Sequence, residues 1–323
     1  MAEMEPQRDE PQSWFAFAGD WLVLETYFRH AARIPANARE FHIRYGEFAD
    51  QAPVAAFLSA LAGVDRIASA FGTPDSLKRR IGLDPNVLTG SSAPHEVYAQ
   101  LVWLANRAQS VAAALQHGLT ELQRGGGPER AAMAQAVLVR CAEEGVDFAA
   151  VIDALRKKIA AYRGPLGSAV TTVNGTDLVD EANQSIGAIE GAAERLMREP
   201  EQNDPKASGI DAVREELSSR EAELGRKRLF TSDLNNLFAE GSLVTGAIHD
   251  LDTRLRMLGD FFADAANRLA EVARIASKEQ LADPAWVGRA VDRNSLVCRA
   301  QTIQEAARRV TQSFFINSVS SAG

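Results

Sequence analysis

The sequence has few of the residues from which common functional sites are built. Only two cysteines occur in 323 residues, Cys141 and Cys298, so there is neither a disulfide framework nor a zinc-binding spacing. Two buried free thiols are the favoured interpretation, and a single long-range disulfide is the alternative. The histidines are scattered, and the pair His95-Glu96 is followed by Ala99 where a metalloprotease helix needs its second histidine.

Catalytic patterns are absent as well. The glycines at 125–127 are followed by Pro128 and Glu129, without the Lys-Ser/Thr pair of a phosphate-binding loop, and indicate a break between helices. The adjacent carboxylates Glu143 and Glu144 do not face each other on a helix, so they make a poor acid/base couple. The sequence therefore predicts no catalytic residue, no metal site and no cofactor, in a protein that is not an enzyme.

An excess of positive charge and long hydrophobic runs are also lacking. The chain has 35 Lys and Arg against 43 Asp and Glu, a net charge of -8, which argues against nucleic-acid binding and against simple adhesion to anionic lipid. No run of about 18 uninterrupted apolar residues occurs, so no constitutive transmembrane helix is predicted. Residues 1–12 are acidic, contain two prolines and lack the basic start of a signal peptide, which predicts a disordered tail.

What the sequence does contain is helical periodicity, most clearly from Ala207 to about Lys278. No proline lies between Pro205 and Pro284, which leaves room for one long helix. From Phe230 onward, apolar or small residues recur in steps of four and three, the heptad spacing of a helix that packs along a partner: Phe230, Leu234, Leu237, Gly241, Val244, Ile248, Leu251, Leu255, Leu258, Phe262, Ala265, Leu269, Val272 and Ala276. An earlier run with the same spacing ends at Lys227, three residues out of phase. We expect this heptad seam to be buried by other helices of the same chain.

Similar periodicity predicts further helices at 14–33, 36–45, 54–71, 95–123, 129–163, 177–198 and 292–315. Gly164-Pro165 is expected to end one of them, and Thr171–Val173 is the only stretch where a strand is allowed. The predicted fold is all-α: an elongated bundle of long antiparallel helices with a coiled-coil stalk. Residues 13–323 would form one domain, with stalk and tip at about 129–250 and the tip near 164–208.

Glycines within the long helix have two interpretations. Gly225, Gly241, Gly246 and Gly259 each weaken a helix by roughly 1 kcal/mol relative to alanine and so offer places to bend. Alternatively, a glycine on the seam permits two helices to approach closely. Both interpretations are open for Gly241, and close packing is favoured for Gly259.

The first helices carry a resemblance to a known family. The pattern runs through Trp21-Leu22-x-Leu24-x-x-Tyr27, then Ile34-Pro35, Glu40-Phe41 and Tyr45-Gly46. It resembles the opening of A-type subunits of the alpha-xenorhabdolysin family, which belong to the cytolysin A-type α-helical pore-forming toxins. The C-terminal third, a long helix followed by a final packing helix, is similar too. The resemblance implies a cytotoxin subunit that leaves the cell without a cleaved signal peptide, or stays cytoplasmic until release. The resemblance further implies that the protein acts at the target-cell membrane together with a second toxin subunit, as part of a two-component system.

The middle of the chain departs from that pattern. Such toxins usually carry an apolar hairpin between their two longest helices, whereas 166–205 is only moderately apolar and contains several acidic residues. Either a short amphipathic element inserts into the membrane, or this subunit docks and its partner inserts. The candidate membrane-contact residues at the tip are Leu166, Val170, Val173, Leu178, Val179, Ile186 and Ile189.

A second function remains open at this point. A non-enzymatic coiled-coil scaffold, or a secreted effector, would bind another protein through the heptad seam. The two readings differ in what fills the seam: helices of the same chain in a bundle, or a helix of another chain in a dimer.

Overall fold

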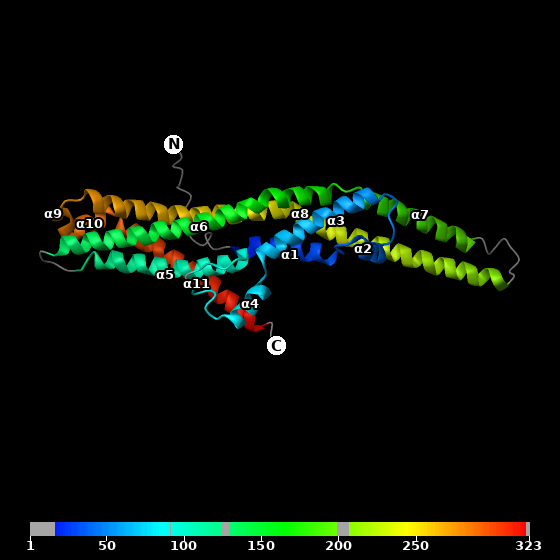
Figure 1. The fold of residues 1–323 in the computed structure, drawn as a ribbon, viewed down its shortest axis with the longest axis horizontal. Helices are drawn as coiled ribbons and strands as arrows, with labels where there is room; N and C mark the ends of the chain where they lie inside the picture. Colours follow the sequence, from blue (N-terminus) through cyan, green and yellow to red (C-terminus); the bar gives the residue numbers. More distant parts are fainter. Residues whose placement is uncertain (1–16, 91, 125–128, 199–206, 321–323) are drawn as a thin grey trace, which may run out of the picture. The chain divides into compact units, whose positions relative to one another are not determined.

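The computed structural model describes residues 17–90, 92–124, 129–198 and 207–320. The predicted tail at 1–12, the glycine-rich break at 125–127 and the part of the predicted tip at 199–206 lie outside these ranges. The described residues form helices and no strand, which confirms the all-α prediction (Figure 1). The helices are α1 (Phe17–Arg33), α2 (Ala38–Tyr45), α3 (Gln51–Phe71), α4 (Pro74–Leu83), α5 (Val97–Glu121), α6 (Arg130–Asn174), α7 (Leu178–Arg198), α8 (Ala207–Ile275), α9 (Lys278–Ala282), α10 (Pro284–Ala290) and α11 (Arg293–Ser320).

The predicted long helix is present as α8, which runs without a break for 69 residues. Every heptad position from Phe230 to Val272 is buried, and only Ala276, beyond the end of the helix, is half-exposed. Side chains of the same chain cover the seam. The ring of Phe148 on α6, for example, packs edge-on against Phe262 with centroids 4.8 Å apart. The seam is therefore part of an intramolecular core.

Helix α6 is longer than the sequence predicts. It covers 45 residues and continues through Pro165, so the predicted end at Gly164-Pro165 and the strand at Thr171–Val173 are both wrong. A proline inside a helix costs about 3 kcal/mol, because it removes a hydrogen bond and its ring crowds the preceding turn. The turns after Pro165 offset this cost by burying Leu166, Val170 and Val173, each no more than 6% exposed.

The chain divides into two compact units. Among the described residues, unit 1 comprises those within 17–21, 69–161 and 248–320, and unit 2 comprises those within 22–68 and 162–247. Helices α1, α3, α6 and α8 each contribute to both units. The helical periodicity of the sequence continues through these boundaries, so the sequence pattern does not indicate where one unit ends and the other begins.

In unit 1, α5 packs along α11 (Figure 1). Two side-chain hydrogen bonds of 3.0 Å join them, one between Gln109 and Thr311 and one between Gln116 and Gln304. Arg130, only 4% exposed, begins α6 and donates hydrogen bonds to the carbonyls of Leu122, Arg124 and Ala282. It thereby satisfies carbonyl groups at the end of α5 that the helix itself leaves without partners.

Gly145 and Gly118 allow close helix approach in unit 1. A Cβ atom on Gly145 would lie 2.9 Å from the Cβ of Ala266 on α8, and one on Gly118 would lie 2.4 Å from the Sγ of Cys141. Cys141 is buried, as expected, and burial raises its pKa to about 11. Cys298 is exposed, contrary to expectation, and both thiols are free.

In unit 2, the core is an aromatic cluster around Phe230 of α8. Four rings surround it edge-on, with centroid distances from 5.0 to 6.2 Å: Phe41, Tyr45, Phe48 and Phe57. Edge-on contacts between aromatic rings add roughly 0.5–1.5 kcal/mol each beyond the burial of their area. The cluster thus fastens α2, the segment after it and α3 to the first half of α8.

Candidate membrane-contact site

The seven predicted membrane-contact residues all lie in unit 2, three at the end of α6 and four on α7. Five of them are buried, with at most 8% of the residue exposed: Leu166, Val170, Val173, Leu178 and Ile189. Val179 and Ile186 are half-buried. The structure therefore brings these residues together in one unit, but buries most of them in the core of that unit. In this conformation they present no apolar face to a membrane.

Close backbone contact holds the end of α6 against α8. A Cβ atom on Gly241 would lie 3.2 Å from Cγ1 of Val170 and 3.4 Å from the side chain of Asn174. This favours the packing interpretation for Gly241. Nothing lies within 4 Å of the Cβ positions of Gly225 and Gly246, so packing explains neither of these two glycines.

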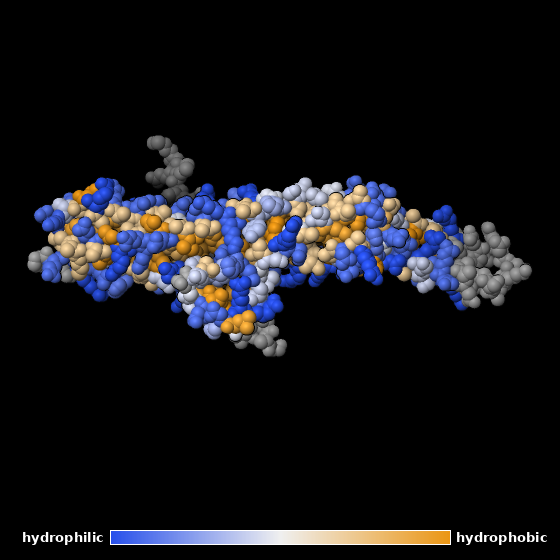
Figure 2. Space-filling model, in the orientation of Figure 1, coloured by the Kyte–Doolittle hydropathy of each residue, from blue (hydrophilic) through white to orange (hydrophobic). Residues whose placement is uncertain are grey.

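Few polar contacts tether α7. Glu181 accepts a hydrogen bond from the backbone N–H of Ala49 at 2.5 Å. Arg228 forms an ion pair of 2.6 Å with Glu190, but both side chains are about half exposed, and such pairs contribute about 0–1 kcal/mol. Over α7, hydrophilic residues predominate on the face shown in Figure 2. Burial of one apolar stripe is consequently the main interaction that keeps α7 in place.

A charged cluster beside the aromatic core fastens α2 to α8. Asp233 accepts hydrogen bonds of 2.8 Å from both Arg44 and the hydroxyl of Tyr45. Burial, and next the contact with Asp233, raises the pKa of Tyr45. Asp233 thus satisfies one donor of each side chain, while the Nε atom of Arg44 is buried without a hydrogen-bond partner among the described residues.

Lys227 is the most unusual member of this region, because it is only 1% exposed. Its Nζ atom donates to the carbonyl of Glu47 and lies 3.5 Å from the centroid of the Phe48 ring. Burial lowers the pKa of Lys227, against the opposing effect of nearby carboxylates such as Glu181. The sequence held one signal for this residue: a cation at a heptad position of the early run.

Helix α3 is long and apolar enough, by length and composition, to cross a membrane, a criterion that also admits core helices of soluble proteins. The sequence expectation of no such segment rested on uninterrupted runs, and Asp65 with Arg66 interrupts this one. Phe57, Leu61 and Val64 of α3 are buried. One face of α3 therefore packs into the core of unit 2. Among the described residues, no group of three or more His, Cys, Asp or Glu side chains is placed to hold a metal ion.

These features define a class by fold: an all-α protein in which long helices shared by two units bury a heptad seam and an amphipathic segment. No family model matches the sequence, and no curated protein matches it either. Solved structures do match. The fold is similar to that of soluble SmhA, from the tripartite α-pore-forming toxin Smh of Serratia marcescens, with a TM-score of 0.53 and 10% identity over 95% of this chain and 94% of that one.

Two further matches have lower TM-scores. Soluble AhlC, of the tripartite toxin AHL from Aeromonas hydrophila, scores 0.45 at 12% identity over 88% of this chain and 96% of that chain. XaxA from Xenorhabdus nematophila scores 0.35 at 10% identity over 94% and 97%. The fold assignment rests on SmhA. The predicted resemblance to α-helical pore-forming toxins is thus confirmed at the level of the fold.

Proposed function

We propose that this protein is a non-enzymatic subunit of an α-helical pore-forming cytotoxin, which binds membranes and assembles with at least one partner subunit. The observation that carries the proposal is the match to SmhA along nearly the full length of both chains. SmhA belongs to a tripartite toxin, whereas the sequence resemblance implies two components. The proposal therefore leaves the number of partner subunits to be measured. Secretion before membrane contact is part of the proposal.

Membrane contact by the seven candidate residues requires that the end of α6 and α7 leave α8. Exposing five large buried side chains costs about 1.5–3 kcal/mol each, or on the order of 10 kcal/mol together. Only burial in a bilayer or against a partner subunit offsets such a cost. We therefore propose that the unit 2 segment 166–189 is protected in the free chain and becomes exposed on assembly.

Dye leakage from liposomes tests the function. The purified chain is mixed with dye-filled liposomes or erythrocytes, alone and together with the products of neighbouring genes. We expect leakage only with a partner and membrane binding that is measurable by flotation. Absence of both leakage and flotation under every combination would refute the proposal.

Site-specific fluorescence tests the membrane-contact segment. In a chain with Cys141→Ala and Cys298→Ser, one cysteine is placed at Val179 on α7 and, in a second variant, at Ala62 on the exposed face of α3. Each is labelled with a polarity-sensitive dye. We expect the emission to shift to the blue on leakage-competent liposomes for Val179→Cys and to stay constant for Ala62→Cys. A blue shift for Ala62→Cys and none for Val179→Cys would indicate that α3, and not α7, contacts the membrane.

A further inference from the structure

A cavity of about 250 Å³ opens between α5 and α6 in unit 1, away from the candidate membrane-contact residues. Four residues of each helix line it with the same spacing, so that one face of α5 meets one face of α6: Arg107, Ser110, Val111 and Ala114, and Glu144, Asp147, Phe148 and Val151. We call it the Arg107 pocket. It is smaller than the roughly 300–1,000 Å³ of a typical drug-sized site, so it admits only a small molecule or a headgroup.

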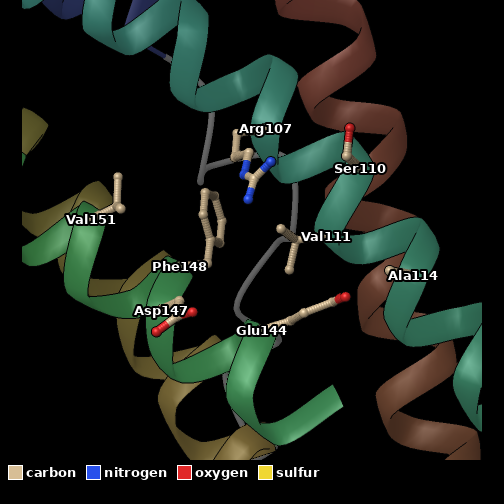
Figure 3. A pocket seen from close by; sticks show the side chains of 8 residues that line it. All are labelled: Arg107, Ser110, Val111, Ala114, Glu144, Asp147, Phe148 and Val151. Atoms are coloured by element: carbon tan, nitrogen blue, oxygen red, sulfur yellow. The ribbon is translucent and has the colours of Figure 1, made fainter. Parts of the chain in front are cut away.

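Opposite charges occupy opposite ends of the Arg107 pocket. The two helices run antiparallel, since Glu121 of α5 pairs with Arg140 of α6 whereas Gln100 pairs with Lys158. In that register Arg107 is level with Val151, and Glu144 is level with Ala114. The two levels are seven residues, or about 10 Å, apart along the helix. Figure 3 shows Arg107 reaching from α5 toward the ring of Phe148, and Glu144 reaching from α6 toward Ala114.

The charged groups of the Arg107 pocket are not paired with other side chains of the described residues. Within the part of the chain that the structure describes, Arg107, Glu144 and Asp147 take part in no hydrogen bond between side chains and in no ion pair within 4 Å. The floor between them is apolar, because it is formed by Val111 and Phe148, whose exposed fractions are 7% and 3%. Arg107 and Glu144 thus stand at opposite ends of an apolar floor, and Asp147 lies on α6 at the level of Val111 between them.

We propose that the Arg107 pocket binds an aminoalkyl phosphate, a molecule of the phosphoethanolamine or phosphocholine type. Guanidinium groups bind phosphate through paired N–H donors, and the hydroxyl of Ser110 adds one more donor at that end. Glu144 accepts the ammonium group, while the linking carbons lie on Val111 and Phe148; Asp147 points to the opposite side from Glu144 (Figure 3). This chemistry occurs in the headgroup of zwitterionic phospholipids and in free aminoalkyl phosphates. The lipid source rests on the proposed membrane function, and the site itself does not.

Titration of the full chain in solution tests the site without any membrane. The methyl signals of Val111 and Val151 are followed by NMR as phosphoethanolamine, phosphocholine, inorganic phosphate or choline is added. We expect saturable shifts with a Kd on the order of 1 mM for the zwitterions, because exposed ion pairs are individually weak. Inorganic phosphate and choline should each bind at least about tenfold more weakly. Equal shifts with inorganic phosphate, or no saturable shift, would overturn the proposal.

Variants assign the roles of the two charged ends. Arg107→Gln and Glu144→Gln should each weaken zwitterion binding about three- to tenfold. Matched controls are Glu143→Gln, next to Glu144 but outside the lining, and Arg289→Gln, an exposed arginine elsewhere in unit 1. The controls should leave binding unchanged. If all four variants behave alike, the shifts do not report the Arg107 pocket and the proposal fails.

Vesicle flotation distinguishes the two sources of the ligand. If the headgroup of a lipid is the ligand, Arg107→Gln and Glu144→Gln reduce binding to phosphatidylcholine and phosphatidylethanolamine vesicles more than to phosphatidylglycerol vesicles. If vesicle binding is unaffected while the soluble titration shows the site, the ligand is a free aminoalkyl phosphate. Lack of leakage together with a positive titration would count against the toxin function alone.

Discussion

At the scale of single residues, the glycines of the long helices differ in whether the structure has room for a side chain at their positions. A Cβ atom at Gly145 would meet Ala266 at 2.9 Å and the carbonyl oxygen of Phe262 at 3.2 Å, so α6 and α8 approach closely only because the side chain is missing. At Gly246 on α8, nothing lies within 4 Å of the same position. The identical residue type therefore serves packing at one site and carries only a conformational cost at the other.

Alanine substitution should separate these two cases. Gly145→Ala is expected to lower the free energy of unfolding by about 1–3 kcal/mol, because the added methyl group overpacks the contact. Gly246→Ala is expected to raise it by about 0.4–1 kcal/mol, because alanine favours the helix without any clash. Urea denaturation followed by circular dichroism measures both. Equal effects of the two substitutions would contradict the packing argument.

Lys227 should make stability depend on pH in the alkaline range. Folding lowers the pKa of its amine below the ordinary value of 10.5, so between the lowered pKa and 10.5 the unfolded chain binds more protons than the folded one. The free energy of unfolding therefore receives a contribution that rises with pH through this window. Lys227→Met should remove that rise, which urea denaturation at a series of pH values from about 7.5 to 10 detects.

Lys157→Met provides the control for this measurement, because Lys157 is 78% exposed and should leave the slope unchanged. The raised pKa of Tyr45 acts in the opposite direction as pH rises through about 10, but it is present in all variants and cancels in the comparison. The same slope in wild type and Lys227→Met would show that the buried amine does not titrate as described.

At the scale of helices, the proposed membrane contact requires that the end of α6 separate from α8. The Cβ position of Gly241 lies 3.2 Å from Cγ1 of Val170, close enough for a disulfide between cysteines at these two positions. With Cys141→Ala and Cys298→Ser in the background, we expect oxidised Val170→Cys/Gly241→Cys to lose leakage activity at least about tenfold. Reduction should restore it.

A second crosslink between the same two helices provides the control. In unit 1, the Cβ position of Gly259 lies 3.8 Å from the Cβ of Ile152, which is the usual separation in a disulfide. Oxidised Ile152→Cys/Gly259→Cys should keep its leakage activity, because it leaves the contact in unit 2 free to open. An oxidised Val170→Cys/Gly241→Cys chain that remains fully active would show that segment 166–189 need not leave α8.

At the scale of the whole molecule, the buried heptad seam separates a toxin subunit from a coiled-coil scaffold. A dimeric coiled coil needs the seam for its partner, whereas here rings and small residues of α6 already cover it in unit 1. The free chain should therefore elute with a light-scattering mass of one chain, 34.9 kDa. A stable dimer in the absence of lipid would favour the scaffold.

Much of the architecture could be predicted from the sequence, because helical periodicity is a local property. The limits of α8, the seam from Phe230 to Val272 and the all-α class all follow from apolar residues that recur every three or four positions. The structure places the seven candidate membrane-contact residues in one unit and buries five of them, which the sequence pattern did not predict. Their contact with a membrane stays a prediction. Periodicity shows which residues share a face, but not what covers that face.

Several features depend on contacts between distant residues and could not be predicted from local sequence patterns. Local propensity stops a helix at Pro165, and only burial of Leu166, Val170 and Val173 against other helices carries α6 past it. The burial of Lys227 depends on the carbonyl of Glu47 and the ring of Phe48, 180 and 179 positions away in the chain. The Arg107 pocket likewise exists because an antiparallel pair of helices brings Arg107 and Glu144 to one groove. The helices and their apolar faces follow from the sequence, since these depend on near neighbours. The partners of those faces, and the charges that meet between them, depend on contacts between distant residues that only the folded chain makes.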